Sequence, residues 1–128
     1  MKYVKRLLDQ IEKRNLKLSK TRITLAYEFA AAAHEGQTRF SGEPYILHPV
    51  EVAIKLLSFN PDEDMVVAAL LHDVVEDCSP EWSFDLLEQE LSEFDEQSDE
   101  VISIVKELTD PVYGPKVSSA QKRLFKKD

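Results

Sequence analysis

Apolar residues recur along this chain at helical spacing, and turn-forming residues interrupt them at intervals. The first such pattern covers residues 3 to 11 and predicts an amphipathic helix, which residues 15 to 19 bring to an end. A second and broader apolar stripe runs from Thr21 to His34. Alanines occupy positions 30 to 33 of that stripe, so another element can approach this helix closely.

The remaining apolar segments are separated by Gly, Pro and Asn. The stretch GQTRFSGEPY, residues 36 to 45, has no helical period and predicts a loop. Pro49 fits the first turn of a helix that continues to about Leu57. Asn60-Pro61-Asp62 marks the start of the most hydrophobic helix in the chain. We expect that helix to be the central one, to run without a break through Cys78, and to end at Ser79-Pro80.

Two further helices are predicted at residues 83 to 91 and 95 to 108, and Thr109-Asp110-Pro111 ends the second. The segment to Asp128 is expected to be irregular and then weakly helical. The chain shows neither an internal repeat nor a linker. These patterns predict an all-α fold in which residues 1–128 form a single domain, a bundle of about six helices that is not a coiled coil.

Composition agrees with this fold and narrows the function. Of the 128 residues, 43% are hydrophobic and 31% are charged, which is the balance of a soluble globular domain. No apolar run approaches the roughly 18 residues of a membrane span, and the N-terminus lacks the apolar stretch of a signal peptide. A single cysteine, Cys78, excludes an intramolecular disulfide. We therefore expect a cytoplasmic protein that does not bind membranes.

The net charge of −8 argues against DNA or RNA as a partner, because phosphate backbones require clustered Lys and Arg. The charge is unevenly distributed. Residues 1 to 22 hold eight of the sixteen basic residues, and five more lie between 116 and 127. Between residues 81 and 100 there are nine acids and no base. The pattern fits solvated acidic and basic faces, and it also fits basic residues that surround a site for an anionic small molecule.

The candidate chemistry begins in the segment MVVAALLHDVVEDC. His72, Asp73, Glu76 and Asp77 are its polar residues, and their spacing of three and four places them on one side of a continuous helix. Carboxylates that share a face repel each other unless a cation lies among them. Mixed His and Asp ligands suit Mn, Fe, Ni or Zn better than Ca or Mg. An exposed acidic helix end is the alternative, and this segment alone leaves both interpretations open.

The other two histidines differ in context. His48 stands where the polar loop meets the next helix, and it precedes the proline that fixes the helix entry, so its ring can point into a cleft. This position favours a role for His48 in the metal site. His34 ends the second helix. For His34 we expect a structural role, with the ring bonded to the last helix carbonyls or bracing the loop that follows.

The motifs AHEGQTRFSGEPYILHPVEVA and AALLHDVVEDC, in this order, resemble the HD-domain metal-dependent phosphohydrolases. Within them the chain is similar to the guanosine tetraphosphate (ppGpp) hydrolase domain of the RelA/SpoT type and its small single-domain relatives. The resemblance covers about Thr21 to Asp110. It implies a Mn²⁺ ion whose ligands are His48, His72 and Asp73. It also implies that Glu76 and Asp77 are catalytic, because they would position the attacking water and take its proton.

For the substrate, the resemblance implies that Arg39 lies against the guanine base. It also implies that residues Ser41 to Tyr45 shape the nucleotide pocket, with Ser41 and Tyr45 in contact with the nucleotide. The family usually has Lys or Arg where this chain has Phe40. The family also completes its site with an Asp in a later segment like KLADRLHN, which has no counterpart here. We therefore expect the C-terminal helices of the family to be missing. The apolar surface left exposed would favour association with a partner or with a second copy.

Three functions follow from the resemblance. The first is metal-dependent hydrolysis of ppGpp or a related small-molecule nucleotide, with release of pyrophosphate. The second is a non-catalytic remnant of an HD domain that binds a nucleotide or a protein partner, since one expected ligand has no counterpart. The third is an HD-type phosphatase that acts on nucleoside monophosphates.

Overall fold

The computed structural model describes residues 2–39, 41–78, 81–110, 114 and 117–125. The described residues form helices and no β-strand, with one isolated bridge between Thr38 and Pro44. This confirms the all-α prediction. The elements are α1 (Lys2–Lys13), α2 (Lys20–Ala33), α3 (Leu47–Leu56), the 3₁₀ turn η1 (Leu57–Phe59), α4 (Glu63–Leu71), α5 (Val74–Asp77), α6 (Phe84–Leu91), α7 (Ser98–Thr109) and α8 (Ser119–Arg123).

Three of the predicted helix starts are built by side-chain caps. The side chains of Ser19, Asp62 and Ser83 each accept a hydrogen bond from the backbone N–H three residues further along. These bonds satisfy amides that have no partner within the helix. Because each cap involves only neighbouring residues, the sequence predicted these starts correctly.

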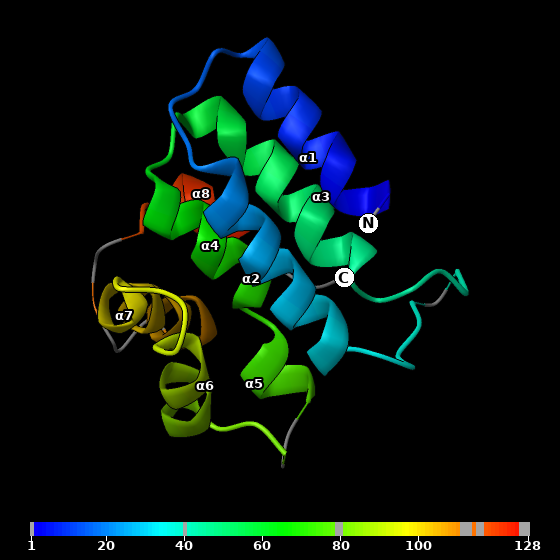
Figure 1. The fold of residues 1–128 in the computed structure, drawn as a ribbon, viewed down its shortest axis with the longest axis vertical. Helices are drawn as coiled ribbons and strands as arrows, with labels where there is room; N and C mark the ends of the chain where they lie inside the picture. The colour runs from blue at the N-terminus through cyan, green and yellow to red at the C-terminus, as the bar shows by residue number, and fades with distance from the viewer. Residues whose placement is uncertain (1, 40, 79–80, 111–113, 115–116, 126–128) are drawn as a thin grey trace.

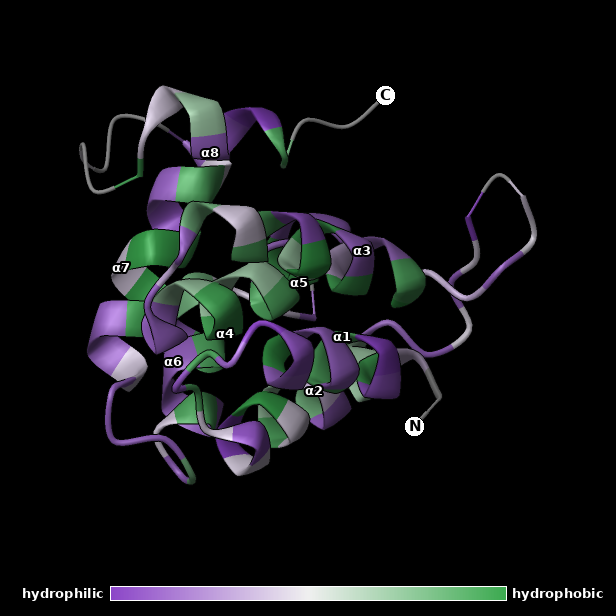
Figure 2. Ribbon diagram, turned by 90° about the horizontal axis from the view of Figure 1, so that it is seen from above, coloured by the Kyte–Doolittle hydropathy of each residue, from purple (hydrophilic) through white to green (hydrophobic). Residues whose placement is uncertain are grey.

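Helix α4 is the centre of the bundle. All its side chains from Met65 to Leu71 are buried, and the helix packs against α2, α3 and α7. Figure 1 shows α4 enclosed by these helices, with α1 lying alongside α3. Hydrophobic residues line the inward faces of the surrounding helices (Figure 2). The prediction that the segment after Asp62 is the central helix is confirmed.

The prediction that this helix runs unbroken through Cys78 is wrong. It stops at Leu71, and α5 begins at Val74 after a turn formed by His72 and Asp73. The His72 ring donates from Nδ1 to the carbonyl of Ala69 at 2.6 Å, the carbonyl that a continuous helix would pair with the N–H of residue 73. A side chain that enters the backbone ladder in this way interrupts a helix. The predicted end at Ser79-Pro80 lies outside the described residues, as do Phe40 and Pro111.

A partly buried arginine on α2 connects α4 with the segment before α7. Arg22 on α2 forms an ion pair of 2.7 Å with Asp64 on α4 and one of 2.9 Å with Asp95 before α7. The Asp95 side chain is only 2% exposed, and that of Arg22 is 18% exposed. Burial alone would lower the pKa of Arg22, but its hydrogen bonds to these two carboxylates raise it. The guanidinium therefore stays charged and balances both acids.

After α7 the structure describes Gly114 and residues 117–125, in which the short helix α8 confirms the predicted weak helix, whereas most of the predicted irregular stretch lies outside the described residues. The buried carboxylate of Glu107 on α7 accepts a hydrogen bond from the N–H of Val117 at 2.8 Å and pairs with Lys122 on α8 at 3.3 Å. Beyond α8, the ring of Phe125 packs edge-on against His72 with ring centres 4.9 Å apart. The segment after α7 thus reaches the His72-Asp73 turn.

The exposed surface concerns two further expectations, namely association with a second copy and the absence of a membrane span. Large apolar side chains are exposed at Leu25, Phe59 and Phe94, which are 38–40% accessible. Association with a second copy stays a prediction. Among the described residues, no helix is both long enough and apolar enough to cross a bilayer.

Candidate metal centre

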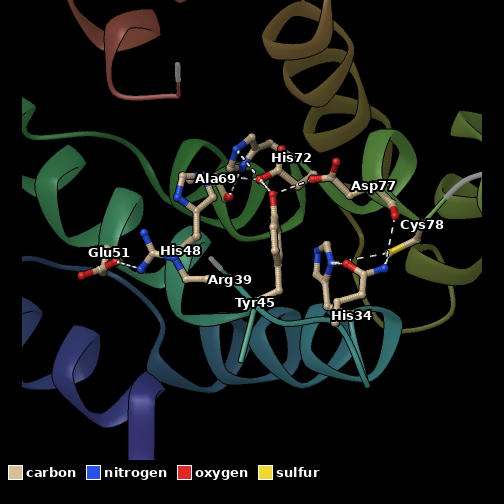
Figure 3. A network of polar contacts seen from close by, with 11 residues as sticks. His34, Arg39, Tyr45, His48, Glu51, Ala69, His72, Asp77 and Cys78 are labelled. Carbon is tan, nitrogen blue, oxygen red and sulfur yellow. Dashed lines mark hydrogen bonds and ion pairs between the residues drawn. The ribbon is translucent and has the colours of Figure 1, made fainter. Parts of the chain in front are cut away.

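Three of the residues selected from the sequence meet at one point. His48 lies in the first turn of α3, whereas His72 and Asp73 form the turn between α4 and α5. One potential ligand atom from each of the three residues lies within 4.8 Å of the others. Figure 3 shows the two imidazoles turned toward the same place. The distances to Asp73 Oδ2 are 3.5 Å from His48 Nε2 and 3.1 Å from His72 Nε2.

The tautomer of His72 follows from its contacts. A carbonyl oxygen can only accept, so the Nδ1 atom that faces the Ala69 carbonyl at 2.6 Å carries the proton. In the neutral ring Nε2 then bears a lone pair. This Nε2 is buried and has no hydrogen-bond donor among the described residues, while a carboxylate oxygen lies 3.1 Å away. Two acceptors this close repel each other unless a cation or a proton lies between them, so the residues fit a metal ion.

Tyr45 connects the two aspartates. Its hydroxyl lies 2.6 Å from Asp77 Oδ2 and 3.1 Å from Asp73 Oδ2. Figure 3 shows the Tyr45 side chain directed toward Asp77. Burial raises the pKa of Tyr45 well above its usual range, and the hydrogen bonds and negative charges of the two aspartates raise it further. The phenol is therefore a proton donor to these carboxylates. The structure places this hydroxyl beside Asp73 and Asp77, and the contact of Tyr45 with a nucleotide, which the resemblance implied, stays a prediction.

The two predicted catalytic acids lie in different environments. Asp77 is partly buried at the end of α5, where Tyr45 holds its carboxylate. Glu76 is exposed on the same helix. The four polar residues do not share one side of a continuous helix, because His72 and Asp73 form a turn whereas Glu76 and Asp77 lie on α5. Asp77 nevertheless comes close to Asp73, since Tyr45 contacts both.

The loop that joins α2 to α3 projects from the bundle (Figures 1 and 2). The loop closes on itself through backbone bonds from Arg39 N to the Glu43 carbonyl and from Tyr45 N to the Gln37 carbonyl. Arg39 Nη1 pairs with Glu51 on α3 at 2.6 Å. Ser41 is exposed and bonds to the Glu43 carboxylate at 3.2 Å. Ser41 therefore lies on the outer part of the loop, whereas Tyr45 lies at the metal centre.

Gln37 is a residue of the centre that the sequence analysis did not select. Its side-chain amide donates to the backbone carbonyl of Asp77 at 3.1 Å and accepts from His34 Nδ1 at 3.0 Å. The role of His34 as a brace for the following loop is thereby confirmed. Cys78 lies within the same group and donates to the Ala33 carbonyl at 3.2 Å, a close approach that the small alanine side chains permit. The only sequence signal for Gln37 was its place in the polar loop.

A cavity of about 490 Å³ opens beside this group. It lies between α2 and the chain after α5, and Phe29, Gln37, Asp77 and Trp82 are among its lining residues. Arg39 and Ser41 are not among them. Pockets of this volume are typical of small-molecule sites, which range from about 300 to 1,000 Å³. Asp77 can therefore be reached from a space of suitable size for a ligand.

Comparison with known proteins shows which sequences this chain is similar to. A family model described as "HD domain" matches residues 26–126. The guanosine-3′,5′-bis(diphosphate) 3′-pyrophosphohydrolase of Vibrio cholerae is 60% identical over 53 residues, 41% of this chain and 8% of that protein. The enzyme with the same name from Borreliella burgdorferi is 43% identical over 84 residues, 66% of this chain and 11% of that protein.

A third relative is the bifunctional (p)ppGpp synthase/hydrolase SpoT of Escherichia coli, which is 59% identical over 56 residues, 44% of this chain and 8% of that protein. The matched segments thus span about a tenth of the length of these curated relatives. The similarity therefore concerns one region of much longer proteins.

Proposed function

This chain belongs to the HD domain family, and from that premise we propose that it is a metal-dependent phosphohydrolase that removes pyrophosphate from the 3′ position of ppGpp. The observation that carries the proposal is the meeting of His48, His72 and Asp73, with the lone pair of His72 Nε2 directed at a buried carboxylate. Relatives that carry ppGpp 3′-pyrophosphohydrolase as their name supply the substrate class.

The three residues would hold a divalent transition metal, and we propose Mn²⁺. Two imidazole nitrogens and one carboxylate oxygen are a set of ligands that favours such metals over Ca²⁺ and Mg²⁺. When bound, the metal would act as a Lewis acid and lower the pKa of water at the site. Ala69 contributes through its carbonyl, because the bond to His72 Nδ1 fixes the ring orientation and increases the basicity of Nε2.

In this proposal Asp77 and Glu76 handle the attacking water. Asp77 is held by Tyr45 and borders the cavity, so its carboxylate can orient a water molecule and accept the proton that the water loses. The water oxygen forms a bond to the phosphorus attached to the 3′ oxygen, and the bond from that phosphorus to the 3′ oxygen breaks. The 3′ oxygen takes up the proton that the water lost, which gives GDP and pyrophosphate. Exposed Glu76 would then assist at the solvent side of Asp77.

Substrate recognition is proposed for the loop. Glu51 holds the guanidinium of Arg39 at 2.6 Å, which keeps a planar cation in one orientation at a partly exposed position. A guanidinium plane that is held in this way can stack on a purine base. Ser41 and the backbone of the loop would contact the nucleotide from the solvent side.

The test is nucleotide hydrolysis by the purified chain. The chain is stripped of metal, supplied with Mn²⁺, and incubated with ppGpp while release of pyrophosphate and GDP is followed. We expect turnover that a chelator abolishes and that His72→Ala abolishes. Arg39→Ala should raise KM for ppGpp more than it lowers kcat, with Lys55→Ala on the exposed side of α3 as the control. Absence of product at enzyme concentrations equal to the substrate concentration, with metal bound, would refute the activity.

A further inference from the structure

The loop before α3 contacts both the side chain and the backbone of Asp77. Tyr45 Oη lies 2.6 Å from the carboxylate oxygen Oδ2, and Gln37 Nε2 donates to the backbone carbonyl at 3.1 Å. Tyr45 and Gln37 are themselves joined, because the N–H of Tyr45 donates to the carbonyl of Gln37 at 3.0 Å. Side chain and backbone of one acid on α5 are therefore fixed by one short stretch of loop, as Figure 3 shows.

The chemistry of the partners determines which group of the Gln37 amide donates and which accepts. The Asp77 carbonyl can only accept, so the amide group of Gln37 that faces it is the NH₂ group. The amide oxygen of Gln37 then faces His34 and accepts from its Nδ1 at 3.0 Å. His34 is 2% exposed, and its ring is tilted by 30° from that of Tyr45, with ring centres 4.8 Å apart. A buried imidazole thus fixes both the Gln37 amide and the Tyr45 ring.

The Tyr45 hydroxyl also separates two negative groups. It lies 3.1 Å from Asp73 Oδ2, the oxygen that faces both imidazoles of the metal centre. The hydroxyl has one proton and can donate it to only one of the two aspartates at a time, and its distance to Asp77 is the shorter one. Without the hydroxyl the two carboxylates would face each other with no proton between them, and their repulsion would displace both from their present positions.

We propose that Tyr45 and Gln37 are positioning residues of the metal centre, with Tyr45 setting the place of the carboxylates of Asp73 and Asp77 and Gln37 setting the place of Tyr45 and α5. The effect on catalysis rests on the proposed function, whereas the effect on metal affinity does not. The fold of the loop and the affinity for metal are therefore linked: a change in the bonds of Gln37 alters a site to which Gln37 contributes no ligand.

The first experiment measures metal binding without nucleotide. Tyr45→Phe removes the hydroxyl and keeps the ring against His34, and Mn²⁺ affinity is measured by calorimetry, with the visible spectrum of bound Co²⁺ as a second readout. We expect affinity to fall about 10-fold, the usual cost of losing an orienting partner of a ligand, and the Co²⁺ spectrum to change. The control is Tyr27→Phe, at a buried tyrosine of α2, for which both should stay unchanged. Affinity and spectrum of Tyr45→Phe equal to those of the control would overturn the role of Tyr45.

The second experiment tests Gln37 through the same readouts and through turnover. Gln37→Glu places a carboxylate oxygen against the Asp77 carbonyl in a side chain of equal size, and Gln37→Met removes the donor should the first variant fold poorly. We expect kcat to fall about 10-fold or more with little change in KM, and Mn²⁺ affinity to fall as well. Gln89→Glu on the exposed side of α6 is the control.

A double variant separates a positioning role from a general loss of stability. Because Tyr45 and Gln37 act on the same acid, the combined effect on kcat should be smaller than the product of the two single effects. The melting temperatures of the same variants report only the stability of the fold. Fully multiplicative effects on kcat, or Gln37 variants with wild-type Mn²⁺ affinity, would overturn the proposal. If the wild type binds metal but hydrolyses no nucleotide, the proposed function fails, and the metal titrations still decide this inference.

Discussion

Replacing Asp73 with asparagine should stabilise the metal-free protein and abolish its response to metal. The side chain is 1% exposed, and its Oδ2 lies 3.1 Å from His72 Nε2. With neither a cation nor a proton between them, His72 Nε2 and Asp73 Oδ2 are two acceptors held against each other in the wild type. Asparagine has the same shape but carries an N–H donor that can bond to Nε2, and it removes a buried charge.

The size of the effect follows from the number of groups that change. The new hydrogen bond satisfies one buried acceptor, a change worth about 1–2 kcal/mol, toward the lower end of the cost of an unsatisfied buried group. For the 128 residues of this chain, the entropy of unfolding is about 0.27 kcal/mol/K. A gain of about 1–2 kcal/mol therefore raises the metal-free melting temperature by about 4–7 °C.

Metal reverses the order. A metal ion that binds only the folded state, at 100 times its Kd, stabilises the wild type by about 2.7 kcal/mol, or about 10 °C at the same entropy of unfolding. The neutral amide of Asp73→Asn is a poorer ligand, so the variant should gain little. Wild type is thus expected to melt below the variant in a chelator and above it in saturating Mn²⁺.

The assay is thermal unfolding, monitored by circular dichroism, once in a chelator and once in saturating Mn²⁺. Asp9→Asn serves as control, because it makes the same charge change at an exposed position of α1. A metal-free melting temperature of Asp73→Asn below that of the control would show that His72 Nε2 does not act as an acceptor toward residue 73. An equal rise of wild type and Asp73→Asn with Mn²⁺ would show that Asp73 is not a ligand.

Two further predictions concern residues outside the metal centre. Arg22→Met leaves the carboxylate of Asp95 buried without its partner and should lower the free energy of unfolding by about 3 kcal/mol in denaturant titration, whereas Lys20→Met, which breaks an exposed ion pair, should cost less than about 1 kcal/mol. Equal losses would contradict the importance of burial. Burial raises the pKa of the Cys78 thiol, so at pH 8 it is less ionised than an ordinary thiol and should react with a disulfide reagent much more slowly in the folded protein than in urea. Equal rates in the two states would refute this.

The helices themselves could be predicted from the sequence because their causes are local. Apolar residues repeat every three or four positions in α1, α2 and α7, and the caps at Ser19 and Asp62 bond only three residues away. The hydrophobicity of the segment after Asp62 likewise predicted the burial of α4. The break after Leu71 could not be predicted in this way, because it depends on where the His72 ring turns once α4 is packed.

The sequence by itself determined the all-α fold, the order of its helices, and the residue types available to bind a metal, since periodicity, capping and the resemblance of its motifs are properties of the chain. Only the tertiary structure decided how these residues meet. Tyr45 contacts Asp77 across 32 positions, and Gln37 reaches the same residue across 40. The physical reason is that such contacts are fixed by the packing of α2, α3 and α4 against one another, whereas a sequence pattern reports only on the element that contains it.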